Sequence, residues 1–202
     1  MSNVPHLTFD SKPSTLCGMF RWFALFPLLL LTAARPGWAA DVRYIDVSEK
    51  DDRYVVSFDA VINAPVDKAL RIMLTPALWP KLSSVIVETK VLEGTQGNPR
   101  KVSMTLRDCI LFFCKTIYKT EEITIKADGY VESLAIPEQS DFSYAREDWH
   151  IFAENGMTRI RYNSEMVPSF FVPPLIGPYI LKSRIRSQLL QTINRLEIMS
   201  RS

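Results

Sequence analysis

The sequence predicts an α+β fold in which one antiparallel sheet packs against a long C-terminal helix. Three observations predict this fold class. Segments with alternating apolar and polar residues follow one another, and turn residues such as Asn155-Gly156 separate them. Two short helical segments interrupt these strands, and the chain ends in a long segment whose apolar residues recur at helical spacing. Helices on one side of an antiparallel sheet form a layered α+β domain.

The predicted domain opens with a hairpin and two short helices. Residues 42–49 and 53–62 are rich in β-forming residues, and the polar residues between them form the turn. A helix is expected to begin at Pro65, because proline suits the first position of a helix. Pro76 breaks that helix, and a second short helical piece that carries Trp79 follows.

About five further antiparallel strands are expected between residues 84 and 166. Alternating apolar residues mark them, and Asp128-Gly129 and Asn155-Gly156 are typical hairpin turns. The final helix is expected from about residue 175 to residue 198. Its apolar stripe consists of Leu181, Ile185, Leu189, Thr192 and Leu196.

The order of these elements, with three local motifs, resembles the SRPBCC or START-like superfamily. The motifs are INAPVDKALRIMLTPALWPKL after the first strands, the hairpin ENGMTRIRY, and VPSFFVPPLIGPYILK before the last helix. The polyketide cyclase and coenzyme Q-binding START-like families look most similar, and the resemblance covers residues 42–198. It implies a helix-grip fold, in which a curved sheet wraps the C-terminal helix around an internal apolar cavity. It also implies a hydrophobic ligand, such as a lipid, a quinone or a polyketide.

Strand parity predicts which residues face the helix, because a sheet with one covered face buries every second residue. With the implied cavity, this parity gives candidate ligand-binding residues. Those on the strands are Met104, Leu106, Ile117, Trp149, Ile151, Ile160, Tyr162 and Met166. Trp79, Tyr179 and Ile180 are expected from the helical side. The same side chains would form a solid core in a domain without a cavity, so the hollow follows from the resemblance alone.

No catalytic residue is predicted. His150 and Asp148 share one strand face, an arrangement that can orient an imidazole for acid–base chemistry. The neighbouring residues Trp149 and Ile151 are expected on the inward face of the strand, so Asp148 and His150 are expected to face solvent. Arg146 and Glu147 are expected to form surface ion pairs. The sequence has no glycine-rich phosphate loop, paired metal-ligand spacing or nucleophile elbow, so no cofactor is expected.

Composition and charge exclude several classes of protein. The 202 residues are 47% hydrophobic, which is typical of a globular domain and not of a disordered or collagen-like chain. The 24 basic and 22 acidic residues give a net charge of +2, so no nucleic-acid partner is expected. Two histidines and three cysteines are too few for most zinc, haem or iron–sulfur sites, and no metal is expected. The composition leaves the oligomeric state open.

Cys109 and Cys114 are candidates for a disulfide. On one uninterrupted strand, residues five apart point to opposite faces and lie too far apart to bond. A bond therefore requires the chain to bend or turn between them. Two buried free thiols are the alternative.

Residues 1–39 are predicted to be a secretory signal peptide. The run FRWFALFPLLLLTAA is shorter than the roughly 20 apolar residues of a membrane-spanning helix. Gly37 and Ala39 occupy the −3 and −1 positions for cleavage before Ala40, and Met19 is a candidate for the true start. An uncleaved signal anchor is the alternative. Residues 40–202 are expected to form a single START-like domain that is periplasmic or secreted.

The apolar segment before the last helix has two interpretations. Residues 170–176 read FFVPPLI, and Lys182, Arg184 and Arg186 follow in the helix. Such a segment would support transient contact with a membrane surface. A buried corner that fixes the helix against the sheet is the alternative.

Together these features predict a binding or carrier protein for a hydrophobic small molecule or lipid. Two alternatives stay open. A cyclase- or aromatase-type enzyme would need inward-facing acidic or basic residues beside Tyr162. A non-binding module that docks to an envelope partner would have a filled core and a large exposed apolar patch.

Overall fold

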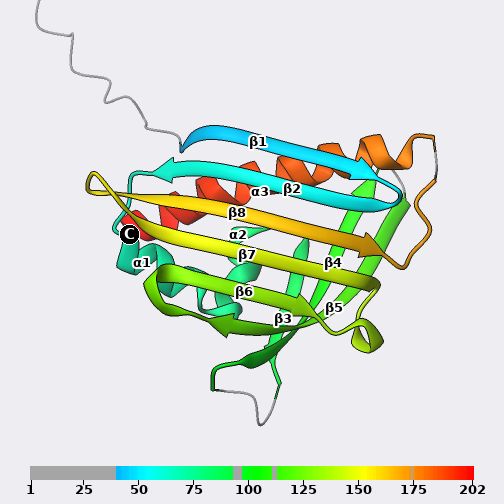
Figure 1. Cartoon of the computed structure of the whole chain (residues 1–202), viewed down its shortest axis with the longest axis horizontal. Coiled ribbons are helices and arrows are strands. Elements are labelled where there is room, and N and C mark those ends of the chain that lie inside the picture. The colour runs from blue at the N-terminus through cyan, green and yellow to red at the C-terminus, as the bar shows by residue number, and fades with distance from the viewer. Residues whose placement is uncertain (1–39, 93–96, 111–112, 174) are drawn as a thin grey trace, which may run out of the picture. The chain divides into compact units, whose positions relative to one another are not determined.

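The computed structural model describes residues 40–92, 97–110, 113–173 and 175–202. These residues form one curved antiparallel sheet of eight strands, with a long helix against its concave face (Figure 1). The predicted signal peptide, residues 1–39, lies outside the described residues. In the part of the chain that is described, no helix is both long enough and apolar enough to cross a membrane.

The strands are β1 (Asp41–Lys50), β2 (Arg53–Ile62), β3 (Ile86–Val91), β4 (Arg100–Ile110), β5 (Phe113–Ile125), β6 (Tyr130–Ala135), β7 (Phe142–Glu154) and β8 (Met157–Pro168). The helices are α1 (Val66–Met73), α2 (Trp79–Leu82) and α3 (Gly177–Arg201). Three 3-10 turns are η1 (Pro76–Leu78), η2 (Ala127–Gly129) and η3 (Pro137–Gln139). The strand order is β1-β2-β8-β7-β6-β5-β4-β3, and all neighbouring strands are antiparallel.

The predicted α+β helix-grip fold is confirmed. Two short helices follow the first hairpin, and α3 crosses the concave face of the sheet (Figure 1). Six strands, rather than about five, lie between the short helices and α3, and the first of them, β3, is an edge strand that pairs only with β4. α3 begins at Gly177 and extends to Arg201, close to the expected limits.

Residues with positive φ angles close the hairpins where the sequence predicts turns. Asp51 and Asp52 have φ angles of 54° and 61° between β1 and β2, and Asn155 and Gly156 have φ angles of 53° and 78° between β7 and β8. Two successive positive φ angles match the twist of a two-residue hairpin. Gly129 follows the same rule, and a Cβ atom there would lie 2.0 Å from the backbone oxygen of Ile151, so only glycine fits.

The solid core lies at the C-terminal half of α3. Ile193 and Leu196 of this half are 1% and 0% exposed, and they pack in one cluster with Phe58 and Ile62 of β2. The carboxylate of Glu197, which is 3% exposed, accepts a hydrogen bond from the backbone N–H of Asn63 at 3.3 Å. This half of the helix is therefore fixed to the sheet by both apolar and polar contacts.

The predicted disulfide between Cys109 and Cys114 is present. These residues stand opposite each other in the β4–β5 hairpin. The chain reverses direction between them, as a bond at this spacing requires, and residues 111–112 lie outside the described residues. The alternative of two free thiols is wrong.

Candidate ligand-binding cavity

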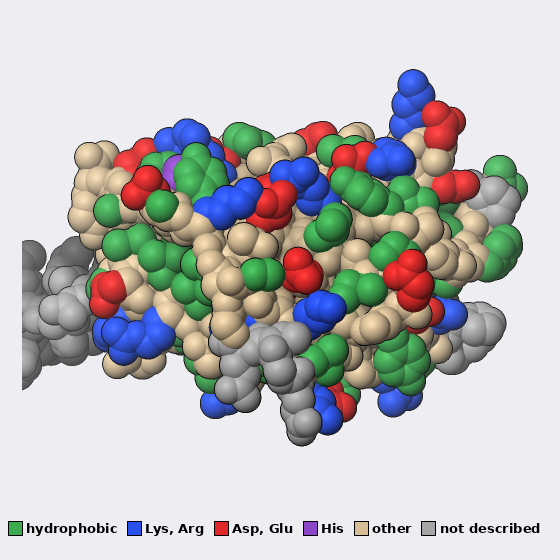
Figure 2. Space-filling view, turned by 60° about the horizontal axis from the view of Figure 1, so that its bottom comes forward, with side chains coloured by type: hydrophobic (Ala, Val, Ile, Leu, Met, Phe, Trp, Pro, Cys, Tyr) green, Lys and Arg blue, Asp and Glu red, His purple; other side chains and the backbone are tan. Residues whose placement is uncertain are grey.

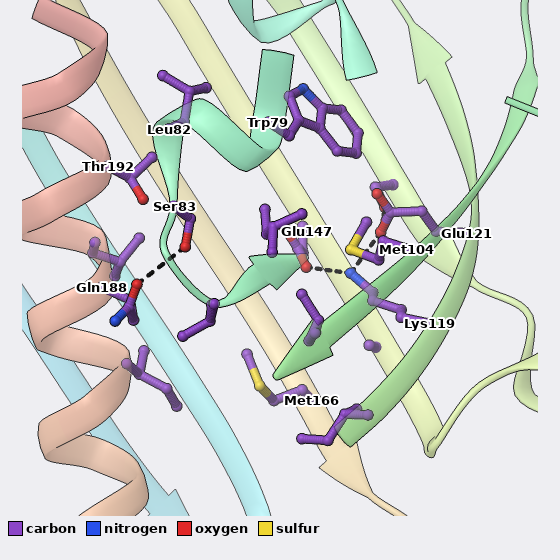
Figure 3. Close-up of a pocket in the computed structure, with 18 of the residues that line it drawn as sticks. Trp79, Leu82, Ser83, Met104, Lys119, Glu121, Glu147, Met166, Gln188 and Thr192 are labelled. Carbon is purple, nitrogen blue, oxygen red and sulfur yellow. Dashed lines mark hydrogen bonds and ion pairs between the residues drawn. The ribbon is translucent and has the colours of Figure 1, made fainter. Parts of the chain in front are cut away.

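A cavity of about 350 Å³ lies between the concave face of the sheet and the N-terminal half of α3. Its volume falls within the range of small-molecule sites in proteins. The short helices contribute Met73, Trp79 and Leu82, and α3 contributes residues that include Leu181 and Gln188. Figure 3 shows these elements around the space, with the strands β4 to β8 on the opposite side.

The cavity remains open because small side chains line part of the sheet. Ala145 of β7 and Ser133 of β6 line the cavity where larger apolar residues would be needed to fill it. On the other side, Trp79 is held by a hydrogen bond from its indole nitrogen to the carbonyl of Met73 at 2.9 Å. Because that ring is fixed, it contributes a stable wall and does not fill the space.

Seven of the sequence-predicted candidate residues line this cavity. They are Trp79, Met104, Leu106, Ile117, Trp149, Ile151 and Met166. They come from four strands and from α2, so the fold brings together residues that are distant in sequence.

Four other candidates lie elsewhere. Ile160 and Tyr162 are 0% and 5% exposed within the solid core, and the Tyr162 ring packs on Trp149 with their centroids 4.1 Å apart. Tyr162 therefore supports the cavity wall from beside Trp149, on the neighbouring strand β8. Tyr179 is 75% exposed and Ile180 is only partly buried, and neither lines the cavity.

The placement of Tyr179 and Ile180 corrects the prediction for the start of α3. Residues four apart share a helix face, and Leu181, Ile185 and Leu189 line the cavity at this spacing. Tyr179 lies two residues before Leu181 and therefore points away from the cavity.

An ionic cluster of Lys119, Glu121 and Glu147 interrupts the apolar wall (Figure 3). The Lys119 ammonium forms ion pairs with both carboxylates, and its nitrogen lies 2.5 Å from Glu121 Oε2. Lys119 and Glu121 are 5% and 4% exposed. Ser133 Oγ donates a hydrogen bond to Glu121 at 2.5 Å. The ionic cluster therefore joins the adjacent strands β5, β6 and β7.

The expectation that Glu147 forms a surface ion pair is wrong. Glu147 lines the cavity, and its partner is the buried Lys119. Arg146 does pair on the outer face, with Glu132 at 2.6 Å and with Asp148 at 3.1 Å. The sequence signal for an inward Glu147 was strand parity, because residues 147, 149 and 151 point to the same face of the strand.

Burial and charge shift the pKa values of the cavity residues in defined directions. Burial lowers the pKa of Lys119, but the charges of Glu121 and Glu147 outweigh it and the net direction is upward. Burial raises the pKa of Glu121 despite the nearby ammonium. Burial and the charge of Glu147 raise the pKa of Tyr162 well above its usual value. Lys119 therefore stays charged, and the two carboxylates share a single ammonium.

His150 lies outside the cavity, among aromatic side chains. His150 is stacked between Tyr130 and Phe152, with ring centroids 3.8 Å and 4.3 Å away, and its strand partner there is Arg161. It does not line the cavity. Across the described residues, no group of three or more His, Cys, Asp or Glu side chains could hold a metal ion.

The segment before α3 is exposed at one end of the cavity. Phe171, Leu175 and Ile176 are 83%, 93% and 63% exposed, while Phe170 beside them lines the cavity. Figure 2 shows hydrophobic side chains at the right-hand end of the molecule, where this segment lies in Figure 1. The alternative of a buried corner is therefore wrong for these three side chains.

Replacement of Lys119 by methionine will test the ionic cluster. We expect Lys119→Met to lower the free energy of unfolding by about 3–5 kcal/mol near neutral pH, because the buried Glu121 and the partly buried Glu147 lose their cation. Without the cation, the pKa of the folded-state Glu121 carboxyl rises further above its unfolded value, so the variant regains stability as the pH falls. Urea denaturation of the wild type and the variant at about pH 5 and about pH 8 will measure the loss in free energy of unfolding at each pH.

Lys126→Met is the matched control for this experiment. The Lys126 ammonium pairs with Glu132 on the outer face and is 52% exposed. Its replacement is expected to cost no more than about 1 kcal/mol. A Lys119→Met loss that is equal at both pH values would contradict the buried ionic cluster.

At the level of sequence, the chain matches no protein-family model and no curated protein. Solved structures do share its fold. The Zhui aromatase/cyclase from Streptomyces sp. R1128 is 12% identical, with 74% of this chain and 94% of that chain covered at a TM-score of 0.61. A START superfamily protein from Mycobacterium smegmatis is 15% identical, with 73% and 97% covered at a TM-score of 0.58.

A third similar structure is a STAR-related lipid transfer protein from Xanthomonas axonopodis. It is 10% identical, and the likeness covers 78% of this chain and 99% of that chain at a TM-score of 0.56. These likenesses span nearly the full length of the other domains and agree with the element order observed here. This chain therefore has the helix-grip fold of the START-like proteins.

Proposed function

We propose that this protein binds a hydrophobic small molecule or lipid in the cavity and carries it. The observation that supports this proposal is the cavity itself, about 350 Å³ between the sheet and α3, with walls that are mainly apolar. Apolar surface removed from water contributes about 25 cal/mol per Å² to binding, so such a space favours an apolar occupant. The alternative of a non-binding envelope module predicts a filled core, so the cavity argues against that alternative.

Two of the similar structures bear names that agree with this proposal. One is named a lipid transfer protein and another an aromatase/cyclase. Lipid transfer is the function that the first of these names states. A lipid, a quinone or a polyketide remains the class of ligand that we propose for this chain.

A cyclase-type enzyme is the second candidate function. The observation that favours it is Glu147, which faces the cavity, contacts Lys119 and lies beside Tyr162. A carboxylate in this position can accept a proton from an acidic carbon, while an ammonium stabilises the oxyanion that forms. Recovery of a bound ligand in chemically altered form would favour the enzyme, and recovery of unaltered ligand favours the carrier.

Filling the cavity will test the binding proposal. Ala145 is 3% exposed and lines the cavity, so Ala145→Phe places a ring in the space that the ligand would occupy. We expect the affinity for the apolar probe 1-N-phenylnaphthylamine to fall by about tenfold or more, which corresponds to about 1.4 kcal/mol. Fluorescence titration will measure the affinity, and native mass spectrometry will show whether co-purified ligand is lost.

Leu134→Phe is the control for that measurement. Leu134 is 49% exposed on β6, opposite Arg146 on the outer face, so its replacement leaves the cavity unchanged. Thermal melting of both variants will show whether they fold. Probe affinity that is equal in the wild type and the folded Ala145→Phe variant would overturn the proposed binding site.

We infer that the domain acts outside the cytoplasm after export. The apolar run and the small residues of residues 20–39 support this inference, as does the Cys109–Cys114 disulfide, because disulfides persist in oxidising compartments. We expect the protein from a periplasmic extract to begin at Ala40. N-terminal sequencing will show this, and an intact N-terminus in the cytoplasmic fraction would reject export.

We also propose transient contact between the exposed segment and a membrane surface. Phe171 and Leu175 present apolar side chains beside the cavity. The Lys115 ammonium lies over the neighbouring Phe170 ring, and Lys182 and Arg184 follow a few residues later in the sequence. Apolar residues with flanking cations suit an anionic lipid surface. A ligand could then pass between membrane and cavity over a short distance.

Vesicle sedimentation will test this contact. The double variant Phe171→Ser with Leu175→Ser is expected to bind vesicles that contain phosphatidylglycerol about tenfold or more weakly than the wild type, because two apolar side chains no longer insert. Ile198→Ser is the control, since Ile198 is 67% exposed near the other end of α3. Equal binding by the wild type and the double variant would exclude this segment as the contact.

A further inference from the structure

The ionic cluster of Lys119, Glu121 and Glu147 is unevenly charged. One ammonium faces two carboxylates, so the fully ionised cluster has one more negative than positive charge. Burial favours proton uptake by Glu121, whose pKa is raised. In either state, the cluster contains more hydrogen-bond acceptors than the Lys119 ammonium can satisfy.

The spare acceptor capacity belongs mainly to Glu147. Glu121 is nearly enclosed, and its Oε2 atom already accepts hydrogen bonds from Lys119 and Ser133. The side chain of Glu147 is 21% exposed and lines the cavity. It pairs with Lys119 through Oε1 and forms a hydrogen bond with the Tyr162 side chain, which leaves part of its acceptor capacity unused. A molecule inside the cavity therefore meets the Glu147 carboxylate before it meets Glu121.

Stability does not explain why these charges lie within an apolar wall. Each buried charge carries a desolvation penalty of several kcal/mol, and replacement of a buried ion pair by apolar residues is often neutral or stabilising. The surrounding positions of the same strand face are apolar, with Ile117 and Ile123 on either side of Lys119 and Glu121. Perturbed, buried charges that line a cavity are typical of functional sites.

Three other charged side chains line the cavity. The positive charge of Arg184 is balanced by Asp108, with Arg184 Nε and Asp108 Oδ2 3.6 Å apart. Arg184 also donates a hydrogen bond to the carbonyl of Cys109. Arg100 donates a hydrogen bond from Nη2 to the carbonyl of Leu74, and its buried Nε atom has no hydrogen-bond partner among the described residues. Arg100 would attract an anion, whereas the ionic cluster would repel one.

We propose that the ionic cluster is the subsite for the polar group of the ligand, and that it selects a cationic or hydrogen-bond-donating group over an anionic one. The ligand class is therefore an amphiphile with an amine or hydroxyl group on an apolar body. A donated hydrogen bond to the Glu147 carboxylate is charge-assisted and strong in a dry cavity. A ligand carboxylate at the same place would lie against the negative charge of Glu147 and be repelled by it. This inference rests on the proposed binding function.

Three amphiphiles with the same twelve-carbon chain will test the selectivity. Dodecylamine, 1-dodecanol and dodecanoate differ only in the polar group, and at about pH 8 they are cationic, neutral and anionic. Each will compete with 1-N-phenylnaphthylamine for the cavity of the full chain. We expect dodecylamine and 1-dodecanol to bind at least about tenfold more tightly than dodecanoate.

Glu147→Gln is the variant that tests the subsite itself. It keeps the size of the side chain and removes the negative charge of Glu147, so the preference for the amine over dodecanoate should fall to about threefold or less. The control is Glu132→Gln, because Glu132 pairs with Lys126 and Arg146 on the outer face. That variant should keep the wild-type order of affinities.

The outcomes separate this inference from the proposed function. Equal binding of all three amphiphiles, or tighter binding of dodecanoate, would overturn the selectivity and leave the apolar cavity as the binding site. Tighter binding of dodecanoate that is lost in Arg100→Gln would place the polar group at Arg100 instead. Failure of every amphiphile and of the fluorescent probe would overturn the proposed function as well.

Discussion

The one-sided attachment of α3 determines where the cavity lies. Ile193 and Leu196 pack against β2 in a dense cluster, and Glu197 binds the backbone of Asn63. The N-terminal half of the helix contributes only partly buried residues, such as Ile185 and Leu189, to this cluster, and these residues also face the strands across the space. Because a rigid helix cannot bend toward the sheet after being fixed at one end, the small residues Ala145 and Ser133 leave a gap that side chains do not close.

The strand alternation predicted the fold and much of the cavity wall. Trp149, Ile151 and Met166 were found by parity because large apolar residues at every second position are a strong signal. The same parity placed Lys119 and Glu121 inward, but charged residues are rarely buried without partners, and those partners are brought close only by the folded sheet. The ionic cluster therefore depends on the pairing of three strands, which alternation within one strand does not reveal.

Helix faces were harder to predict than strand faces at the start of α3. The stripe that includes Leu181, Ile185 and Leu189 was correctly recognised, but Tyr179 and Ile180 were also expected to face the cavity. Successive helical residues are rotated by about 100°, so Tyr179, two positions before Leu181, points to a different side of the helix from the cavity. The position of Tyr179 on the helix places it in solvent beside the exposed segment.

The proposals together imply one orientation for a bound amphiphile. With its polar group at Glu147, its apolar body must contact the surrounding apolar wall, which includes Met104, Met166 and Leu189. Phe170 lines the same space, and the exposed Phe171 continues the apolar surface outward. A ligand that enters with its polar group first must desolvate that group before it reaches the carboxylate. The barrier to entry would then arise from desolvation of the polar group, and the retention of the ligand from the hydrogen bond formed at the end of the path.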